Sequence, residues 1–379
     1  MYRAVFLGFL WLVSFSISKG EDATVAAFTD QGFRLPQPNR ELPFPETHGS
    51  HPEYLIEWWY VTGHLFAGDR RFGYQATFFR RAYPADGHAP VLEEFGADQL
   101  YLAHMALSDI ESETFYFEER LNRDGWDAFA EVGRMDVRNG NWSLVMEDPE
   151  TEEMFLQFTV EGKVQAELSL VPERPLVRFG EDGLSRKGED PEAVSYYLSF
   201  SHLRSKGTLF VEGEEFTVEG LSWMDHEIAS RQLGEDLEGW DWMAVHFDDG
   251  TALKAYQLRR PDGSPDPWSA FIWFDEENQK TTLYAEDFEW RRVGYWESPE
   301  TGTRYPVEVE LRAPHPKTES TLHLRIEPFF EAQEITGELG GTGYWEGACR
   351  VIDVNTGEVV GQAYMELVGY QAPVSATLR

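Results

Sequence analysis

Two acidic residues, two positions apart, could carry out acid–base chemistry. Asp225 and Glu227 lie in Ser222-Trp223-Met224-Asp225-His226-Glu227, and alternate residues of a strand face the same side. A carboxylic acid in an apolar cavity can keep its proton near neutral pH. Addition of water to an isolated alkene needs such an acid, so we predict catalytic roles for this pair, with Asp225 as the proton donor. The alternative is that Asp225 pairs with Arg231 or caps a short helix within residues 228–237.

Aromatic side chains near these acids could stabilise the carbocation that forms when an alkene is protonated. Trp223 precedes Asp225, and two further tryptophans follow in Gly239-Trp240-Asp241-Trp242. A protein with 13 Trp, 16 Tyr and 26 Phe can line an apolar cavity with rings, although packed β-barrels also need large side chains. The expected ligand-binding residues are Trp59, Tyr60, Gln75, His104, Trp223, Trp240 and Trp242.

Glu57 is the third catalytic candidate, because it would share one face of a strand with Trp59 and Val61. An acid on such a face is either functional or the partner of a buried arginine such as Arg80, and pairing is the more common case. His104 lies on a similarly apolar strand face, where a histidine is more often a core residue than a base.

Other chemistry finds little support in the sequence. The ten histidines show no closely spaced zinc motif, and no acidic loop has calcium spacing, so we predict no metal site. We found no nucleophile elbow, phosphate-binding loop or dinucleotide fingerprint, so we expect no cofactor.

The charge of the chain limits its partners. A formal net charge of −35 repels the phosphate backbone that a nucleic-acid-binding protein must neutralise, and it disfavours anionic lipid surfaces. We therefore expect no nucleic acid, and we expect a small hydrophobic ligand as the partner.

Residues 1–20 resemble a secretory signal peptide. Arg3 precedes an apolar stretch at 4–17 that is short for a membrane span, and Ser18 and Gly20 suit a cleavage site. We predict a periplasmic or extracellular protein with no stable membrane insertion after the signal is removed. Cys349 is the only cysteine, so no intrachain disulfide can form, and its segment is typical of a strand.

The elements that must position these residues are short strands. Residues 21–53 are rich in proline and polar residues and indicate an extended lead-in, and short alternating runs separated by turn residues follow. Helical periodicity is scarce, with residues 121–129 and 228–237 as short exceptions. Many short strands at hairpin spacing indicate an all-β protein.

A repeat divides these strands into two domains. Trp58, His64 and Gly68 recur at the same spacing as Trp240, His246 and Gly250, and a Tyr-Gln pair and a double arginine follow in both copies. This predicts an internal duplication, with a first barrel at 54–212 and a second at 213–379.

The longest motifs resemble one family. They include Glu57-Trp58-Trp59-Tyr60-Val61-Thr62-Gly63-His64, Ser222-Trp223-Met224-Asp225-His226-Glu227 and Tyr344-Trp345-Glu346-Gly347-Ala348. The chain resembles, from about residue 44 to 370, the lipocalin-like family that contains carotenoid 1,2-hydratases (hydroxyneurosporene synthases) and AttH-type exported proteins. The resemblance implies two tandem lipocalin-like antiparallel β-barrels packed together and, for some members, hydration of an isoprenoid double bond. Members commonly have Asp-Arg-Glu-Trp where this chain has Asp225-His226-Glu227-Ile228, so the two acids are kept and the arginine and the aromatic residue are not.

Two functions therefore stay open. The protein is either a hydratase-like enzyme acting on an isoprenoid or polyene, or a non-catalytic carrier or accessory protein for a hydrophobic molecule. An enzyme requires Asp225 at the wall of an apolar cavity, a carrier requires a cavity with an open mouth, and filled barrels would leave a scaffold without a ligand. Because the two copies differ around their acids, we expect the site where the barrels differ and meet.

Overall fold

The computed structural model describes residues 26–83, 98–125, 127–231, 233–337, 339 and 343–374. The predicted signal peptide lies outside this range, as does the start of the lead-in. A short 3₁₀ helix, η1 (Glu46–His48), precedes the first strand, and the remaining named elements are all strands. The expected all-β fold is confirmed.

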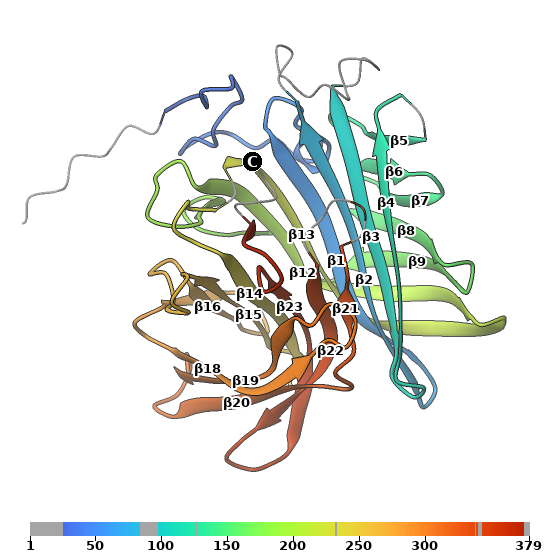
Figure 1. The fold of residues 1–379 in the computed structure, drawn as a ribbon, viewed down its shortest axis with the longest axis vertical. Helices are drawn as coiled ribbons and strands as arrows, with labels where there is room; N and C mark the ends of the chain where they lie inside the picture. Colours follow the sequence, from blue (N-terminus) through green and yellow to red (C-terminus); the bar gives the residue numbers. More distant parts are fainter. Residues whose placement is uncertain are drawn as a thin grey trace, which may run out of the picture.

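The first sheet is a nearly closed barrel built from strands β1 to β13 (Figure 1). Its main path runs β4-β3-β2-β1-β13-β12-β9-β8-β7-β6-β5, and every pairing is antiparallel. The strands are β1 (Ile56–Ala67), β2 (Arg70–Ala82), β3 (Gln99–Asp109), β4 (Thr114–Arg123), β5 (Ala128–Ala130), β6 (Asp136–Asn139), β7 (Trp142–Asp148), β8 (Glu153–Val160), β9 (Val164–Pro172), β10 (Val177–Arg178), β11 (Leu184–Arg186), β12 (Val194–Val211) and β13 (Glu214–Arg231).

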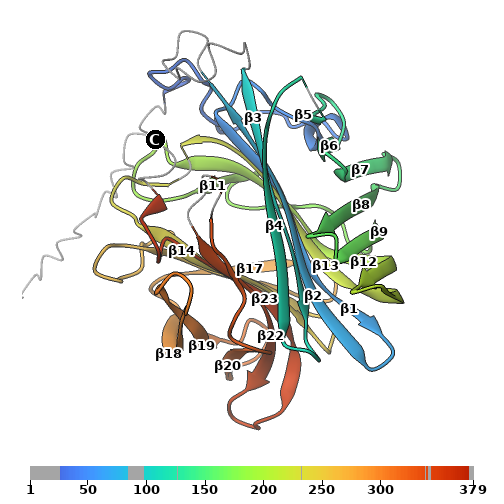
Figure 2. The same ribbon diagram turned by 45° about the vertical axis from the view of Figure 1, so that its right-hand side comes forward.

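The second sheet is a half-barrel that packs against the first, and the turned view in Figure 2 separates the two. Its path runs β17-β16-β15-β14-β23-β22-β20-β19-β18. The strands are β14 (Gly239–Phe247), β15 (Ala252–Arg259), β16 (Ala270–Phe274), β17 (Lys280–Tyr284), β18 (Glu289–Glu297), β19 (Arg304–Pro314), β20 (Thr321–Pro328), β21 (Glu334–Ile335), β22 (Tyr344–Asp353) and β23 (Val359–Val368).

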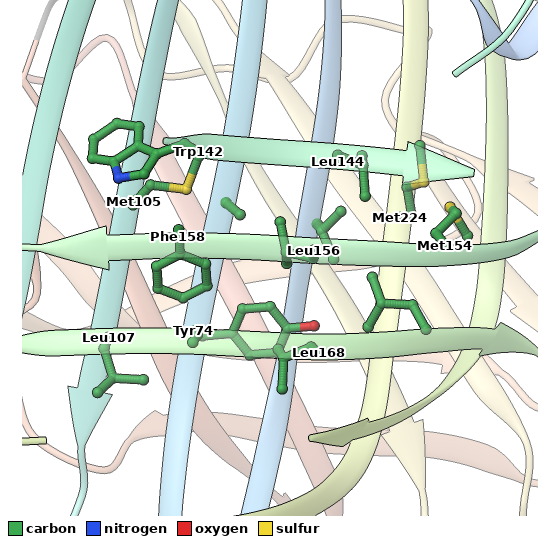
Figure 3. Close-up of a cluster of buried hydrophobic side chains, with 14 of the residues drawn as sticks. Tyr74, Met105, Leu107, Trp142, Leu144, Met154, Leu156, Phe158, Leu168 and Met224 are labelled. Carbon is green, nitrogen blue, oxygen red and sulfur yellow. The ribbon is translucent and has the colours of Figure 1, made fainter. Parts of the chain in front are cut away.

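Each sheet encloses its own apolar core. In β8, alternate side chains from Met154 to Val160 are buried, as expected for a strand with one face inward. Figure 3 shows Trp142, Tyr74 and Phe158 filling the first barrel together with leucines and methionines. A second cluster, which includes Cys349, covers the concave face of the second sheet. Packed apolar side chains therefore occupy the interior of the first barrel in this region.

The duplication is visible in the order of neighbouring strands. The path β4-β3-β2-β1-β13-β12 in the first sheet corresponds to β17-β16-β15-β14-β23-β22 in the second. Arg80 faces Glu57 across the first hairpin, and Arg259 faces Gly239 at the matching place, so the double arginines are equivalent. The Tyr-Gln pairs are not equivalent, because the second hairpin has a different turn: Tyr74 faces Gly63, whereas Tyr256 faces Trp242.

The passage between the sheets lies later in the chain than the predicted boundary. Residues 212 and 213 form the turn between β12 and β13, and both strands belong to the first sheet. The chain crosses to the second sheet after Arg231, before Gly239. The short helix suggested within residues 228–237 is not formed by the described residues there, because β13 continues to Arg231; residues 121–123 and 128–129 are likewise strand.

Two other expectations concern the membrane and the thiol. Within the described residues, no helix has both the length and the apolar character needed to span a bilayer. Cys349 lies buried in β22, as its segment predicted, and burial raises the pKa of its thiol well above the usual range.

Candidate functional site

An apolar cavity of about 420 Å³ lies between the two sheets. This volume falls in the range of about 300–1,000 Å³ that is usual for small-molecule sites. Leu121 and Leu339 both border the cavity and are each 46% exposed, so the cavity opens to the surface beside them. The site is where the barrels meet, and it is not a barrel lumen.

Strand alternation decides which residues of β1 reach this cavity. Trp58 and Tyr60 face the cavity, whereas Trp59 faces the first barrel, where its ring stacks on His226 and its Nε1 donates to the carbonyl of His48. Trp59, which was predicted to bind the ligand, therefore does not line the cavity. The alternation was read correctly, but it does not reveal which face of a strand is turned toward the barrel.

The repeated hairpins provide matching walls. Trp58 and Trp240 both line the cavity, and their neighbours Tyr60 and Trp242 meet edge to face with ring centroids 5.3 Å apart. The lining therefore contains, from the predicted ligand-binding residues, Tyr60, His104, Trp240 and Trp242.

The repeated histidines join the sheets in a reciprocal way. His64 on β1 donates from Nε2 to the carbonyl of Ala363 on β23 at 2.9 Å, and His246 on β14 donates to the carbonyl of Ser201 on β12 at 2.7 Å. Burial lowers the pKa of His64 to about 3 and that of His246 to about 4, so both rings are neutral at pH 7. Their recurrence reflects assembly of the two sheets.

Asp225 lies at the cavity wall, as the enzyme hypothesis requires. Its carboxylate accepts hydrogen bonds from Trp223 Nε1 at 2.6 Å, from the Tyr197 hydroxyl at 2.5 Å and from the Ser199 hydroxyl. Lys254 Nζ lies 4.0 Å away. The three hydrogen bonds occupy three of the acceptor sites of this carboxylate. Neither expected alternative occurs, since Arg231 pairs with Asp190 and Glu192.

Glu227 shares the cavity wall with Asp225. Lys187 Nζ lies 2.7 Å from its Oε2, and the Ser195 hydroxyl also donates to that oxygen. Each of the two acids thus has its own donors, and none of the contacts described for them joins one carboxylate to the other.

Trp223 and Gln75 stand behind the cavity wall. Trp223 contributes to the site by holding Asp225, and Gln75 donates to the Thr77 hydroxyl, which does line the cavity. Both side chains are buried and do not line the cavity, although both were predicted to bind the ligand. Each instead contacts a residue that lines the cavity.

Lys254 is a buried cation behind Asp225. Its Nζ lies 3.1 Å from the ring centroid of Tyr197 and 3.6 Å from that of Phe179, with no hydrogen-bond partner among the described residues. Burial lowers its pKa well below the usual range. The aromatic rings are the main partners of this amine.

His104 borders the cavity from β3. Its Nδ1 is 2.7 Å from the Tyr344 hydroxyl, and its Nε2 is 3.2 Å from Glu119 Oε1. This chain of polar groups crosses from the first sheet to the second, which gives the histidine a structural task at the cavity edge.

Glu366 on β23 is a cavity acid that the sequence motifs did not indicate. It is half-buried in the wall, and its Oε2 accepts a hydrogen bond from Trp240 Nε1 at 2.7 Å. Desolvation in the wall, with the negative charges of Asp225 and Glu227, raises the pKa of Glu366 to about 7. Near neutral pH a substantial fraction of this side chain therefore carries a proton.

Glu346 lies directly across from Glu366 on the neighbouring strand β22. It is fully buried and accepts from the Tyr60 hydroxyl at 3.1 Å, and its Oε1 has no described hydrogen-bond partner. Burial, together with the charge of Glu366, raises its pKa well above the usual range.

Comparison with known proteins places this architecture in a family. The AttH-like family model matches residues 35–370. The chain belongs to the AttH-like family. No curated protein matches it significantly.

Two solved structures are similar to this AttH-like protein. A candidate AttH protein from Nitrosomonas europaea is 32% identical, with a TM-score of 0.78, over 89% of this chain and 99% of that one. Kievitone hydratase from Nectria haematococca is 15% identical, with a TM-score of 0.65, over 91% of this chain and 98% of that one; this likeness shows the shared fold.

The departure from the common Asp-Arg-Glu-Trp pattern lies away from the cavity of this AttH-like protein. His226 is on the opposite face of β13 from Asp225 and Glu227, and neither His226 nor Ile228 lines the cavity. The two positions that depart from the pattern therefore do not contribute to the cavity wall, whereas the two acids do.

Glu57 is likewise on the barrel side of the AttH-like chain. Its Oε1 accepts from His51 Nδ1 at 2.8 Å and His226 Nε2 at 2.9 Å, and its Oε2 accepts from Arg80 Nε at 3.0 Å. Burial opposes ionisation, but these hydrogen bonds and the Arg80 charge hold the pKa of Glu57 well below its usual range. The expected pairing with Arg80 is present.

Among the residues that the structure describes, one group has a metal-like geometry, which the sequence spacing did not suggest. The ligand atoms of His51, Glu57 and His226 lie within 4.8 Å of one another. The guanidinium of Arg80 already contacts the same carboxylate, so a cation would meet positive charge. Hydrogen bonding accounts for this cluster.

Proposed function

We propose that this AttH-like protein binds an apolar isoprenoid, polyene or lipid-like molecule between its two sheets and adds water to one of its double bonds by acid catalysis. The observation that supports this proposal is an apolar cavity with Asp225, Glu227 and Glu366 on its wall. Rings from Trp58, Trp240 and Trp242 surround the same space and could stabilise a carbocation.

Hydration is favoured over simple binding by the placement of ionisable groups. A carrier for an apolar molecule gains nothing from carboxyl groups in its cavity wall, since burial of such groups costs free energy. One protein with this fold is a hydratase acting on kievitone, which is the proposed class of reaction.

A non-catalytic carrier is the second candidate, favoured by the open mouth beside Leu121 and Leu339. A carrier would return its ligand unchanged. We further propose that the protein is exported to the periplasm or the extracellular space, on the basis of residues 1–20. Exported protein that still began at Met1 in N-terminal sequencing would refute cleavage of the signal.

The ligand is tested by extraction of the purified protein with organic solvent, followed by mass spectrometry. Leu102→Trp should exclude the ligand, because Leu102 lines the cavity and an indole would occupy the space. Val359→Trp is the matched control, since Val359 is 54% exposed and lies outside the cavity lining. Equal ligand content in the two variants would refute binding between the sheets.

The reaction is tested by loading the protein with lycopene or squalene from detergent micelles in ¹⁸O-labelled water. Hydration predicts a product that carries one ¹⁸O atom. Recovery of the unchanged probe, retained by the wild type and lost from Leu102→Trp, would favour the carrier.

A further inference from the structure

Two acids face the cavity from equivalent positions of the duplicated fold. In the first copy, Tyr60 on β1 lies opposite Asp225 on β13. In the second, Trp242 on β14 lies opposite Glu366 on β23. Because β1 and β14 are the repeated strands, and β13 and β23 are their matching neighbours, Asp225 and Glu366 occupy the same place in the two copies.

The next strand gives these two acids opposite surroundings. On β12, Ser199 lies across from Asp225 and donates to it. On β22, the matching position is Glu346, which lies across from Glu366. The first acid therefore has a hydrogen-bond donor beside it, whereas the second has another carboxyl group.

Nearby cations make the surroundings of Asp225 and Glu366 still more different. Asp225 has Lys254 at 4.0 Å, but neither Glu366 nor Glu346 forms an ion pair with any described residue. Lys187 lies in the same cavity wall, and its ammonium group is bound to Glu227. The carboxyl pair of the second copy thus has no cation of its own.

Two directly opposed residues on neighbouring strands have Cβ atoms about 4.5–5.5 Å apart. Two carboxylates at that separation in an apolar wall disfavour ionisation of each other, so the pair retains a proton. Besides desolvation, the charges that act on Glu366 are those of Asp225 and Glu227 from β13, which favour its neutral form, and that of Lys187, which opposes it. Burial, together with the charge of Glu366, in turn raises the pKa values of Glu346 and Tyr344 on β22 and of Tyr60 on β1.

We propose that Glu366 is the proton donor and that Asp225 is the base of the same reaction. This inference rests on the hydration proposed above. Two carboxyl groups whose environments separate their protonation states are the usual arrangement for paired acid and base roles. The pattern differs from the sequence-based prediction, in which Asp225 was the acid.

The proposed step conserves atoms and charge. The carboxyl group of Glu366 transfers its proton to one alkene carbon, which forms a C–H bond and leaves a carbocation on the other carbon. The oxygen of water bonds to that carbon, and the proton lost from this water passes to Asp225. Asp225 has about four acceptor sites, of which three are used by Trp223, Tyr197 and Ser199, so one remains. Asp225 then releases its proton to solvent at the cavity mouth, and solvent returns a proton to Glu366, so both groups regain their starting states.

The protonation state is tested by infrared difference spectroscopy of the free protein between pH 5 and pH 9. A carboxylic-acid band should disappear with a midpoint near pH 7, and Glu366→Gln should remove it. Glu358→Gln is the matched control, because Glu358 is exposed and directly precedes the same strand. Asp225→Asn should lower the midpoint, since it removes a negative charge that favours the protonated acid.

The chemical role is tested with the ¹⁸O assay. Glu366→Gln should lower turnover by about 100-fold or more, with ligand content equal to that of the wild type and Glu358→Gln unaffected. Turnover of Glu366→Gln at the wild-type rate would overturn the donor role and leave hydration standing. A wild type that retains its ligand but forms no ¹⁸O product would instead refute hydration, and the donor role with it. Persistence of the titrating band in Glu366→Gln would overturn the assignment of the neutral acid.

Discussion

The substitution Glu57→Gln separates a structural role of Glu57 from a catalytic one. Glu57 is fully buried on the barrel side of β1. Its two oxygens accept five hydrogen bonds, from the Ser50 hydroxyl, the backbone and ring nitrogens of His51, Arg80 Nε and His226 Nε2. A neutral amide cannot accept all of them, and it leaves the buried Arg80 guanidinium without an opposite charge.

The magnitude follows from the burial of both partners. Loss of one member of a buried ion pair costs about 3–5 kcal/mol. Arg80 keeps three other acceptors, Gln99 Oε1 and the carbonyls of His51 and Tyr54, so only its charge is left uncompensated. We therefore expect a loss near the lower end, about 3 kcal/mol, in the free energy of unfolding.

Urea denaturation followed by tryptophan fluorescence measures this loss. Glu53→Gln is the control, because Glu53 pairs with Arg40 at the surface with side chains 35% and 33% exposed, and such pairs contribute about 0–1 kcal/mol. The folded-state pKa of Glu57 lies below its ordinary value of 4.5. Its contribution is therefore present above pH 4.5 and is lost as the pH falls through the folded-state value, so the difference between the wild type and Glu57→Gln should shrink in acid.

Two results would refute this reasoning. A loss below about 1 kcal/mol at pH 7 would mean that the buried pair does not stabilise the barrel. Wild-type stability with a large loss of hydration would instead assign Glu57 to the chemistry, although it faces away from the cavity.

Three further predictions concern the cavity and the contact between the sheets. Replacement of both His64 and His246 by Gln should reduce the loss of stability at acid pH. Their folded-state pKa values of about 3 and about 4 lie below the ordinary 6.5, so the unfolded chain binds more protons and wild-type stability falls as the pH drops from about 6.5 to about 3. Urea midpoints across this pH window measure the fall, and parallel profiles for the wild type and the double variant would refute the assignment to these histidines. Asp225→Asn should abolish ¹⁸O incorporation with an unchanged circular dichroism spectrum, and a fully active variant would exclude Asp225 from catalysis. Lys254→Met should destabilise the protein at pH 7 by about 3 kcal/mol, because the buried Asp225 carboxyl group would lose the amine 4.0 Å from it, and an unchanged or higher urea midpoint would show that relief of the desolvated amine outweighs this pair.

The sequence predicted the fold well because strands leave a local signal. Alternation in segments such as Met154 to Val160, with turn residues between them, is set by each strand's own burial pattern. The domain boundary was harder, since β12 and β13 are long and continuous and no composition shift marks the crossing after Arg231. Pairing partners far apart in the chain, such as β1 with β13, decide that boundary.

The site was predicted in part. Tyr60, Trp240 and Trp242 were expected to line a cavity and do so, together with Asp225 and Glu227. Glu366 was missed because Met365-Glu366-Leu367 carries no motif, and only the register that places it opposite Trp242 relates it to Asp225. Alignment of the two copies by strand order, in place of residue spacing, is the signal that could have found it.

The duplication explains how one cavity can hold two acids in different surroundings. A strictly symmetric dimer of one domain would present two identical acids in identical surroundings. Fusion of the copies into one chain allows β12 to place Ser199 beside Asp225 while β22 places Glu346 beside Glu366. Asp225 is thereby surrounded by hydrogen-bond donors, whereas the neighbour of Glu366 on the next strand is another carboxyl group, and desolvation with the charges of Asp225 and Glu227 favours the neutral form of Glu366. Since a carrier has no need for this difference, the divergence between the copies is the strongest structural argument that the cavity performs proton transfer.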